Sequence, residues 1–413
     1  MPFYAAPGIY VEEVPSGARP IGAVGTSVAG FVGTAPDQSA RRDEVVAVNN
    51  WSDFLRIYAS SEAPSTDLAR AVFGFFDNGG GRCYVANVAP GAAIAGAGRR
   101  RSGLQLLETM DEIAIVAAPG YSDAASYDAL LSHCEKMEDR VAILDSPEDV
   151  PDIDQLTKVA TAPAGRSRSG EGATGGGAAA AGGGDTPPGE AGGLRPRQSN
   201  YGAFYVPYIE VLDPISGENV YTPPSGHVAG VWARNDATRG VHKAPANESV
   251  RGAINLRYRF TRQEQELLNP KGVNCIRYFT AEGIRIWGAR MLAAEASEWR
   301  YINVRRLFNM LKESIAEGTN WVVFEPNDST LWRSIKRDIR AFLTRVWRDG
   351  ALFGRTPEEA FFVKCDEETN PPDVRDAGQL VVLIGLAPVK PAEFVVFKLS
   401  QSAGGTETEI VGG

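Results

Sequence analysis

The side chains best suited to acid–base chemistry are the three histidines, His133, His227 and His242. A hydrolase needs a nucleophile held against a base that is itself oriented by a third group. His133 lies within an expected helix, beside Cys134, and His227 follows a Pro-Pro-Ser-Gly turn. Neither belongs to a G-x-S-x-G elbow or to an H-E-x-x-H zinc motif. We therefore interpret them as surface or helix-capping histidines, and the sequence indicates no catalytic residue.

The other candidates for metal or redox chemistry are four cysteines and one acidic run. Each cysteine stands alone in apolar sequence, without a C-x-x-C pair, which is typical of reduced, buried thiols. A divalent cation at Asp366-Glu367-Glu368 would need more converging oxygen ligands than this run supplies. The sequence therefore predicts no metal site and no cofactor. The cysteines are Cys83, Cys134, Cys275 and Cys365.

A stripe of basic side chains is the strongest charge pattern. Residues Thr330–Asp349 carry apolar side chains at helical spacing, and five cations fall on the opposite side of the same expected helix. Like charges four residues apart repel by about 0.2–0.5 kcal/mol per pair unless a counter-charge is supplied. The stripe is therefore either a solvated face or a contact surface for an acidic partner. Its members are Arg333, Lys336, Arg337, Arg340 and Arg348.

The elements around these residues indicate an α/β sheet. Two short apolar runs, Ile113–Ala118 and Val141–Leu144, flank a helix around Tyr127–Glu138, as in a buried βαβ-like unit. The Gly-rich run Ile21–Gly33 predicts a further strand and contains neither a dinucleotide fingerprint nor a P-loop. A second amphipathic helix is expected at Asn303–Glu317.

Residues 161–198 interrupt this domain with a stretch rich in Gly, Ala, Ser and Pro. Such a composition cannot bury enough apolar surface to offset the entropy lost on ordering. Because β-type sequence resumes at Gly202–Leu212, we expect a flexible surface insertion within the α/β domain. A docking or decoy loop is the alternative.

Length and charge limit the classes of function. A chain of 413 residues is long enough for two or three domains. Its formal net charge of −9 argues against nucleic acid as a partner, because phosphate binding needs excess basic surface. No apolar run approaches the ~18 residues of a membrane span, and the N-terminal residues lack the features of a signal peptide. We therefore expect a protein that stays in the cytosol unless it is exported by another route.

The two ends of the chain carry strands that lack partners in the sequence. After Leu380–Leu386 and a connection containing two prolines, the run Phe394–Leu399 has apolar residues on both faces, and only a polar tail follows. A terminal strand of this kind aggregates unless another strand pairs with it. The opposite end, Ile9–Val14, reads as an extended strand closed by prolines and detached from any core. It is the candidate partner.

Several segments together resemble the tail sheath proteins of contractile phage tails and related contractile injection systems. They occur in the family's order and span nearly the whole chain. The segments are PGIYVEE at the N-terminus, FGFFDNGGGRCYVANV at 73–88, GVWARNDATRGVHKAPAN at 230–247, GVNCIRYF at 272–279, EGIRIWGARML at 282–292, YINVRRLF at 301–308, FEPNDSTLWRSIKRDIRAFL at 324–343 and LIGLAPVKPAEFVVFKLSQ at 383–401.

The resemblance implies an α/β fold with a subtilisin-like scaffold domain that lacks a catalytic triad. It also implies a C-terminal α+β sheath domain, and extended N- and C-terminal strand arms. The expected ranges are 1–22 for the N-terminal linking arm, 23–90 for a part that packs with the core sheath domain, 91–270 for the subtilisin-like domain, 271–390 for the C-terminal domain and 391–413 for the C-terminal arm and tail.

In function, the resemblance implies a structural subunit and not an enzyme. The subunits would polymerise as stacked hexameric rings into a helical sleeve around an inner tube, then contract and drive the tube through a target envelope. Further implied partners are baseplate and tail-terminator or cap proteins, with no nucleic acid and no direct membrane insertion. The sheath would assemble in the bacterial cytoplasm, as part of a phage tail or of a tail-like particle that can be released.

The resemblance also assigns roles to the unusual residues noted above. The terminal arms would complete sheets of neighbouring subunits, and the basic stripe Arg333–Arg348 would face the tube. Two alternatives stay open, a catalytically degenerate α/β hydrolase-like enzyme and a non-contractile binding module. The arm residues are Ile9, Tyr10, Val11, Val14, Phe394, Val395, Val396, Phe397 and Leu399.

Overall fold

The computed structural model describes residues 20–60, 63–96, 101–161 and 192–396, with the backbone of two short strands at 398–399 and 408–409. The chain forms two compact units, and each is described by itself. The larger comprises Val24–Lys312 with Pro388–Gly413, and the smaller Met1–Ala23 with Glu313–Ala387. The N-terminal arm candidates Ile9, Tyr10, Val11 and Val14, together with most of the insertion 161–198, lie outside the described residues.

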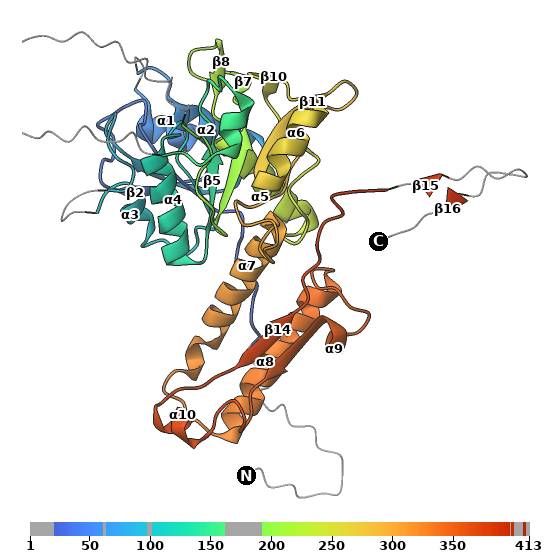
Figure 1. The fold of residues 1–413 in the computed structure, drawn as a ribbon. Helices are drawn as coiled ribbons and strands as arrows, with labels where there is room; N and C mark the ends of the chain where they lie inside the picture. The colour runs from blue at the N-terminus through green and yellow to red at the C-terminus, as the bar shows by residue number, and fades with distance from the viewer. Residues whose placement is uncertain are drawn as a thin grey trace, which may run out of the picture. The chain divides into compact units, whose positions relative to one another are not determined.

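A β-sheet forms the centre of the larger unit (Figure 1). It has nine strands in the order β2-β3-β1-β4-β5-β6-β11-β12-β9. The six strands from β3 to β11 are parallel to their neighbours, and β2, β12 and β9 pair antiparallel at the edges. The predicted α/β sheet is therefore confirmed. The strands are β1 (Ala29–Gly33), β2 (Val45–Val48), β3 (Cys83–Asn87), β4 (Ile115–Ala117), β5 (Val141–Asp145), β6 (Gly202–Val206), β9 (Glu248–Ser249), β11 (Val273–Phe279) and β12 (Gly283–Ile286).

Helices cover both faces of this sheet, because its central strands are apolar on both sides. One core cluster contains Phe31, Phe75 and Trp232, and the other contains Leu131 and Phe204. Helices α1 (Trp51–Tyr58), α2 (Asp67–Asp77) and α5 (Ser225–Arg239) contribute to the first cluster. Helices α3 (Leu104–Leu107), α4 (Ala124–Met137) and α6 (Arg262–Leu268) contribute to the second.

The larger unit also holds a three-stranded antiparallel sheet in the order β10-β7-β8. None of the helices in the described part of the chain is long and apolar enough to cross a lipid bilayer. The remaining elements are β7 (Ile209–Leu212), β8 (Asn219–Thr222), β10 (Ala253–Leu256), the 3₁₀ helices η1 (Ile153–Thr157), η2 (Asn269–Lys271) and η3 (Asn320–Val322), and helix α7 (Ile302–Thr319), which begins in the larger unit and ends in the smaller one.

The smaller unit is built on the amphipathic helix α8 (Ser329–Arg348) and a two-stranded antiparallel sheet. Asp328 caps α8 by accepting hydrogen bonds from two backbone N–H groups of the first turn. The apolar side of α8 is buried, and the helix packs against β13. The other elements are β13 (Phe361–Lys364), β14 (Leu383–Leu386), α9 (Pro357–Ala360) and α10 (Pro372–Asp376).

Several expected strands are shorter than the sequence predicts, and the difference is largest in two of them. The run Ile21–Gly33 is a strand only at Ala29–Gly33, where it pairs with β3 and β4. In Phe394–Leu399, residues 394–396 are not in a strand, and Lys398–Leu399 form β15, which pairs with β16 (Thr408–Glu409). The expected strand over Phe394–Leu399 is one that a neighbouring subunit pairs, and it stays a prediction, because a single chain holds no such partner.

A buried ion pair fixes the start of α7. Arg306 donates to both carboxylate oxygens of Asp236 on α5, at 2.9 and 2.6 Å, and to the carbonyl of Thr26 at 2.9 Å. Its guanidinium lies 4.6 Å from the ring centroid of Trp232. The two charged side chains are only 3% and 5% exposed. Loss of one partner would therefore leave the other charge buried without compensation.

We expect Arg306→Met to lower the free energy of unfolding by about 3–5 kcal/mol, because Asp236 would remain buried without its counter-charge. Urea unfolding followed by tryptophan fluorescence measures this change. The exposed pair Arg262–Glu266 provides a matched control, and Arg262→Met should change stability by less than about 1 kcal/mol. Equal effects of the two substitutions would contradict the structural role of the buried pair.

Candidate functional site

The carboxyl ends of the parallel strands form the edge at which an enzyme on this kind of sheet would act. A cavity of about 290 Å³ opens there. Thr34 and Pro119 follow β1 and β4, and Asp67 begins α2. The cavity is lined by Thr34, Ser65, Thr66, Asp67, Leu68, Arg70, Pro119 and Tyr121.

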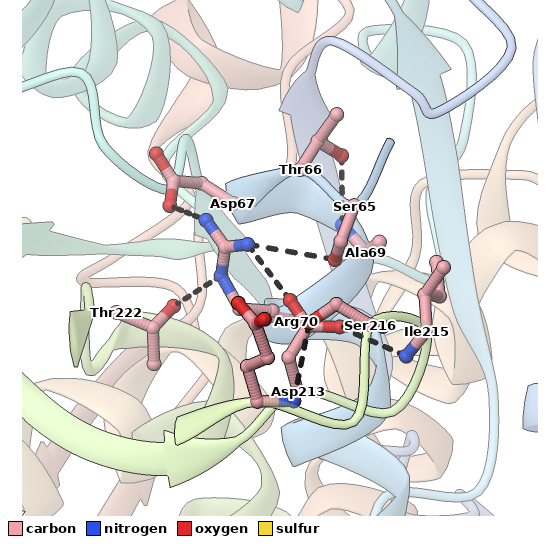
Figure 2. Close-up of polar contacts among 10 residues, drawn as sticks. Ser65, Thr66, Asp67, Ala69, Arg70, Asp213, Ile215, Ser216 and Thr222 are labelled. Atoms are coloured by element: carbon pink, nitrogen blue, oxygen red, sulfur yellow. Dashed lines mark hydrogen bonds and ion pairs between the residues drawn. The ribbon is translucent and has the colours of Figure 1, made fainter. Parts of the chain in front are cut away.

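Arg70 at this cavity is fully engaged with side chains of its own chain (Figure 2). Its Nη2 donates to Asp67 at 2.6 Å, and its Nη1 donates to Asp213 at 3.0 Å. Weaker contacts at 3.4 Å join its Nε to Thr222 and its Nη1 to Ser65. An incoming anion would have to displace a carboxylate. The cluster therefore connects α2 to the β7–β8 hairpin and offers no free cation to a ligand.

Asp213 also organises the turn between β7 and β8. It accepts hydrogen bonds from the backbone N–H groups of Ile215 and Ser216, at 2.8 and 3.2 Å. Burial alone would raise the pKa of Asp213, but hydrogen bonds from Ser65, the turn backbone and Arg70 outweigh it and hold the pKa below its usual value. The carboxylate is therefore charged and balances Arg70.

A second acidic residue at this edge, Asp145, ends β5 and is 2% exposed. It accepts hydrogen bonds from the backbone N–H of Ser225 at 2.8 Å and from its hydroxyl at 2.6 Å. Burial is the main cause that raises the pKa of Asp145 to about 7. Ser225, the first residue of α5, is 0% exposed. The pair therefore joins a strand end to a helix start, and the serine hydroxyl is closed off from any substrate.

The histidines do not approach this pair in the way that a hydrolase requires. His133 on α4 and His227 on α5 are 6% and 2% exposed, so the prediction of surface or capping histidines is wrong for both. Burial lowers the pKa of each to about 4, which leaves both neutral at pH 7. The ring of His227 lies against Gly74, where an added Cβ would be 2.3 Å away. His242 comes three residues after the end of α5, whose 15 residues span about 20 Å.

The remaining candidates for chemistry are explained by local structure. All four cysteines are free and buried, as predicted. Asp366 accepts hydrogen bonds from the backbone of Glu368 and Thr369 and so closes a turn, and Glu368 pairs with Lys364. Across residues 20–60, 63–96, 101–161 and 192–396, no group of three or more His, Cys, Asp or Glu side chains is arranged to hold a metal ion.

The basic stripe lies on the outward side of α8. Arg333, Arg337, Arg340 and Arg348 are exposed, and Lys336 is half-buried. Arg337 pairs with the neighbouring Asp338 at 3.0 Å, and Arg340 pairs with Glu358 on α9. Within the part of the chain that the structure describes, the other three cations form no ion pair. The geometry of the stripe is therefore as expected, whereas its orientation towards a tube stays a prediction.

The C-terminal arm presents three consecutive apolar side chains to solvent. Phe394, Val395 and Val396 are 73%, 68% and 67% exposed. Phe397 lies outside the described residues, and the backbone of Leu399 belongs to β15. Among the residues that the structure describes, none covers this apolar run.

The β13–β14 sheet is the feature that sequence reasoning missed. Phe361 and Val363 face inwards, whereas Phe362 and Leu383 are 54% and 51% exposed on the outer face. The ring of Phe362 lies over its cross-strand partner Gly385, where an added Cβ would be 2.0 Å from the ring. Among the described strands, β13 and β14 pair only with each other. The one local signal in the sequence is that Phe361 and Phe362 are both apolar, although successive residues of a strand point to opposite faces.

We expect Asp145→Asn to alter the pH dependence of stability. Because burial raises the pKa of Asp145 to about 7, the folded chain holds this proton more tightly than the unfolded chain. The wild type therefore loses stability as the pH rises from 4 to 7. The free energy of unfolding of Asp145→Asn, relative to that of wild type, should therefore rise by about 4 kcal/mol from pH 4 to pH 7. Urea unfolding at several pH values measures it, with the exposed Asp149→Asn as control, and parallel curves for wild type and Asp145→Asn would contradict the expectation.

Two domain families match most of the chain. The phage tail sheath protein central domain matches residues 106–291, and the phage tail sheath C-terminal domain matches residues 294–402. The tail sheath protein of Vibrio phage KVP40 is 30% identical over 209 residues, which cover 50% of this chain and 30% of the phage protein. The chain thus spans about a third of the length of the first curated relatives that it matches.

Solved sheath structures match over nearly the whole chain. The PVC sheath complex of an extracellular contractile injection system, in its contracted state, is 27% identical with a TM-score of 0.74, covering 98% of this chain and 99% of that chain. The contracted helical sheath of the anti-feeding prophage is 29% identical with a TM-score of 0.71, covering 97% of this chain and 100% of that chain. Domain matches, sequence relatives and structures agree, and the chain belongs to the family of contractile tail sheath proteins.

Proposed function

We propose that this chain is the structural subunit of a contractile sheath, which polymerises as stacked hexameric rings around an inner tube and contracts to drive the tube through a target envelope. The observation that carries the proposal is the β13–β14 sheet with its exposed apolar face. The exposed apolar residues Phe394–Val396 of the arm likewise lack a strand to pair with. Family membership also supports the proposal, because sheath proteins from contracted assemblies resemble this chain along nearly its whole length.

The link between subunits would form by strand addition. A sheet of two strands has one outer edge per strand at which a further strand can hydrogen-bond. The segment Phe394–Leu399 of one copy and Ile9–Val14 of another would occupy these edges in a third copy. Alternate side chains of an added strand point to opposite faces. One set would cover Phe362 and Leu383, which are exposed in the isolated chain.

The exposed cations of α8 would face the tube. Their partner would be an acidic surface, because Arg333, Lys336 and Arg348 form no ion pair among the described residues of their own chain. Exposed ion pairs contribute about 0–1 kcal/mol each. A contact made of several such pairs holds the sheath on the tube collectively, and it can be released pair by pair as the sheath shortens.

The larger unit would serve as a subtilisin-like scaffold without a catalytic triad. The direct hydrogen bonds between Asp145 and Ser225 support this view, because they place an aspartate at a strand end and a serine at a helix start with no histidine between them. The domain ranges 23–90, 91–270 and 271–390 belong to the same proposal. The chain would act without a cofactor and without enzymatic activity.

The proposed partners are further copies of the chain, an inner tube protein, a baseplate and a terminator or cap protein. Among the similar structures is the baseplate of the anti-feeding prophage, and the sheath complex of a second injection system covers nearly all of this chain. We propose a tail-like injection particle that assembles in the bacterial cytoplasm and can be released.

Val395→Pro tests the linking arm, because proline removes a backbone donor that a strand ladder needs. The residue is 68% exposed, so the melting temperature of the subunit should not change. Electron microscopy should show that striated tubes are lost. Val395→Ala keeps the donor and should assemble like wild type. Normal tubes from Val395→Pro would overturn the role of residues 394–399 as a linking strand.

The double variant Arg337→Glu/Arg340→Glu tests the tube-facing surface. Reversal of two charges should weaken co-sedimentation with the inner tube about tenfold or more, through loss of about 1 kcal/mol or less per exposed contact and new repulsion. Arg262→Glu on α6 reverses a charge of the larger unit that is also exposed, at 88% against 53% for Arg337 and Arg340, and serves as control. Unchanged tube binding and extended-sheath assembly in the double variant would contradict the assignment of this face.

A further inference from the structure

The carboxylate of Glu393 is held by three side chains of its own larger unit. Arg290 donates to both of its oxygens, each at 2.8 Å, in a bidentate pair. Asn269 donates to one oxygen at 2.7 Å, and the hydroxyl of Tyr301 donates to the other at 3.1 Å. The side chain of Arg290 is 5% exposed and that of Glu393 is 19% exposed. We call these four residues the Glu393 clamp.

The clamp is built on a rigid base. The backbone N–H of Arg290 donates to Asn274 Oδ1 at 2.7 Å, and Asn274 Nδ2 donates back to the carbonyl of Arg290 at 2.8 Å. Asn274 belongs to β11 in the central sheet and is 0% exposed. Arginine in a bidentate pair also fixes the plane of the carboxylate, which a lysine would not do. The clamp therefore fixes the position of Glu393 relative to the central sheet.

The clamp lies at the point where the chain stops forming hydrogen bonds with the rest of the larger unit and becomes exposed. Upstream of it, Asn303 on α7 donates to the carbonyl of Val389 at 3.1 Å. Directly after Glu393 come Phe394, Val395 and Val396, which are the consecutive exposed apolar residues of the arm. Among the described residues after Pro388, Glu393 is the last whose side chain has a hydrogen bond to the larger unit.

Hydrogen-bond balance explains why this pair resists opening. If Glu393 left, Arg290 would stay nearly buried, with only the carbonyl of Asn269 at 3.3 Å as an acceptor for its guanidinium. Removal of one member of a buried charge pair costs much more than separation of an exposed one. Surface pairs in this chain, such as Lys364–Glu368, lack that penalty. The clamp can therefore hold the root of the arm when the arm is pulled.

We propose that the Glu393 clamp is the fixed root of the C-terminal arm and sets the direction in which residues 394–399 reach a neighbouring subunit. The inference rests on the proposed function, in which this arm links subunits. A root at residue 393, and not at the end of β14, shortens the free segment and reduces the conformations that an arm must lose on binding. Glu393 and Arg290 are thus positioning residues, which act on assembly through the segment that follows them.

Spin labels at two exposed positions of the larger unit test the first part of the proposal. Gln263→Cys on α6 and Ala392→Cys beside the clamp are both exposed, and the four native cysteines are buried. Pulsed electron–electron distance measurements on the full chain should give a narrow distribution. Glu393→Ala should broaden it at least about twofold, because the released segment samples a coil, and Glu393→Gln should broaden it less. Unchanged widths in both variants would overturn the clamp.

Assembly tests the second part. Glu393→Ala should yield about tenfold fewer striated tubes at equal concentration, because one buried charge pair per subunit is lost. Glu368→Gln, which removes an exposed pair, should give normal widths and normal tubes. Circular dichroism melting shows whether each variant is folded. Broadened distances with undiminished tubes would overturn the positioning role.

The clamp and the linking arm can fail separately. Val395→Pro leaves the clamp intact, so normal tubes from that variant would remove the linking role of the arm, and with it the reason for a positioned root. If Val395→Pro abolishes tubes while Glu393→Ala leaves both distances and tubes unchanged, the arm links subunits without a fixed root. We expect both variants to reduce assembly, and only Glu393→Ala to broaden the distance distribution.

Discussion

A strand forms a complete ladder only when both of its edges are paired, and a sheet of two strands leaves two edges unpaired. The β13–β14 sheet is such a sheet within the described chain. An isolated two-stranded hairpin is marginally stable in water, and here α8 supports its inner face while Phe362 and Leu383 remain exposed on the outer one. Residues 394–396 of the arm, in turn, expose apolar side chains and have no strand to pair with. The chain is thus incomplete in two places of the same kind, which is the expected condition of a subunit that is finished by its neighbours.

The larger unit neutralises three of its buried or nearly buried carboxylates with arginine side chains. Arg70, Arg290 and Arg306 each bind a carboxylate from a distant part of the chain, on β7–β8, the arm root and α5 respectively. A planar guanidinium makes several directed hydrogen bonds at once, so each pair fixes an orientation as well as a distance. Polar groups also pair with each other at the edge where an enzyme on this kind of sheet would bind substrate, since Ser225 donates to Asp145. On the proposal above, the unit would serve as a mount for the arm that leaves it.

Local signals in the sequence predict the elements well. Helix α8 and strand β5 lie within a residue of the expected ranges Thr330–Asp349 and Val141–Leu144. Pairings between distant residues were not predictable, because 103 positions separate Arg290 from Glu393 and no periodicity relates them. The pairing of β13 with β14 is also non-local. Burial of His133 and His227 was missed for a different reason, since a single residue type does not reveal what packs on it. The functional prediction came from the resemblance to sheath proteins, because the local sequence patterns did not indicate a function.

Exposure separates the arginines of this chain into two groups with different mechanical uses. Arg306 is 3% exposed, and loss of its partner would leave a charge uncompensated in the core, whereas Arg340 is 53% exposed and contributes little through any one contact. A contractile sheath needs both behaviours at once. It must keep its subunits linked while it slides along a tube. Strand ladders break only as a whole, so they suit the links between subunits, whereas buried pairs such as Arg306–Asp236 stabilise the subunit itself. On the proposed function, the solvated cations of α8 would exchange partners singly, which suits a sliding contact. The same residue type would therefore stabilise the subunit where it is buried and release the tube where it is exposed, because burial sets the free energy of each contact.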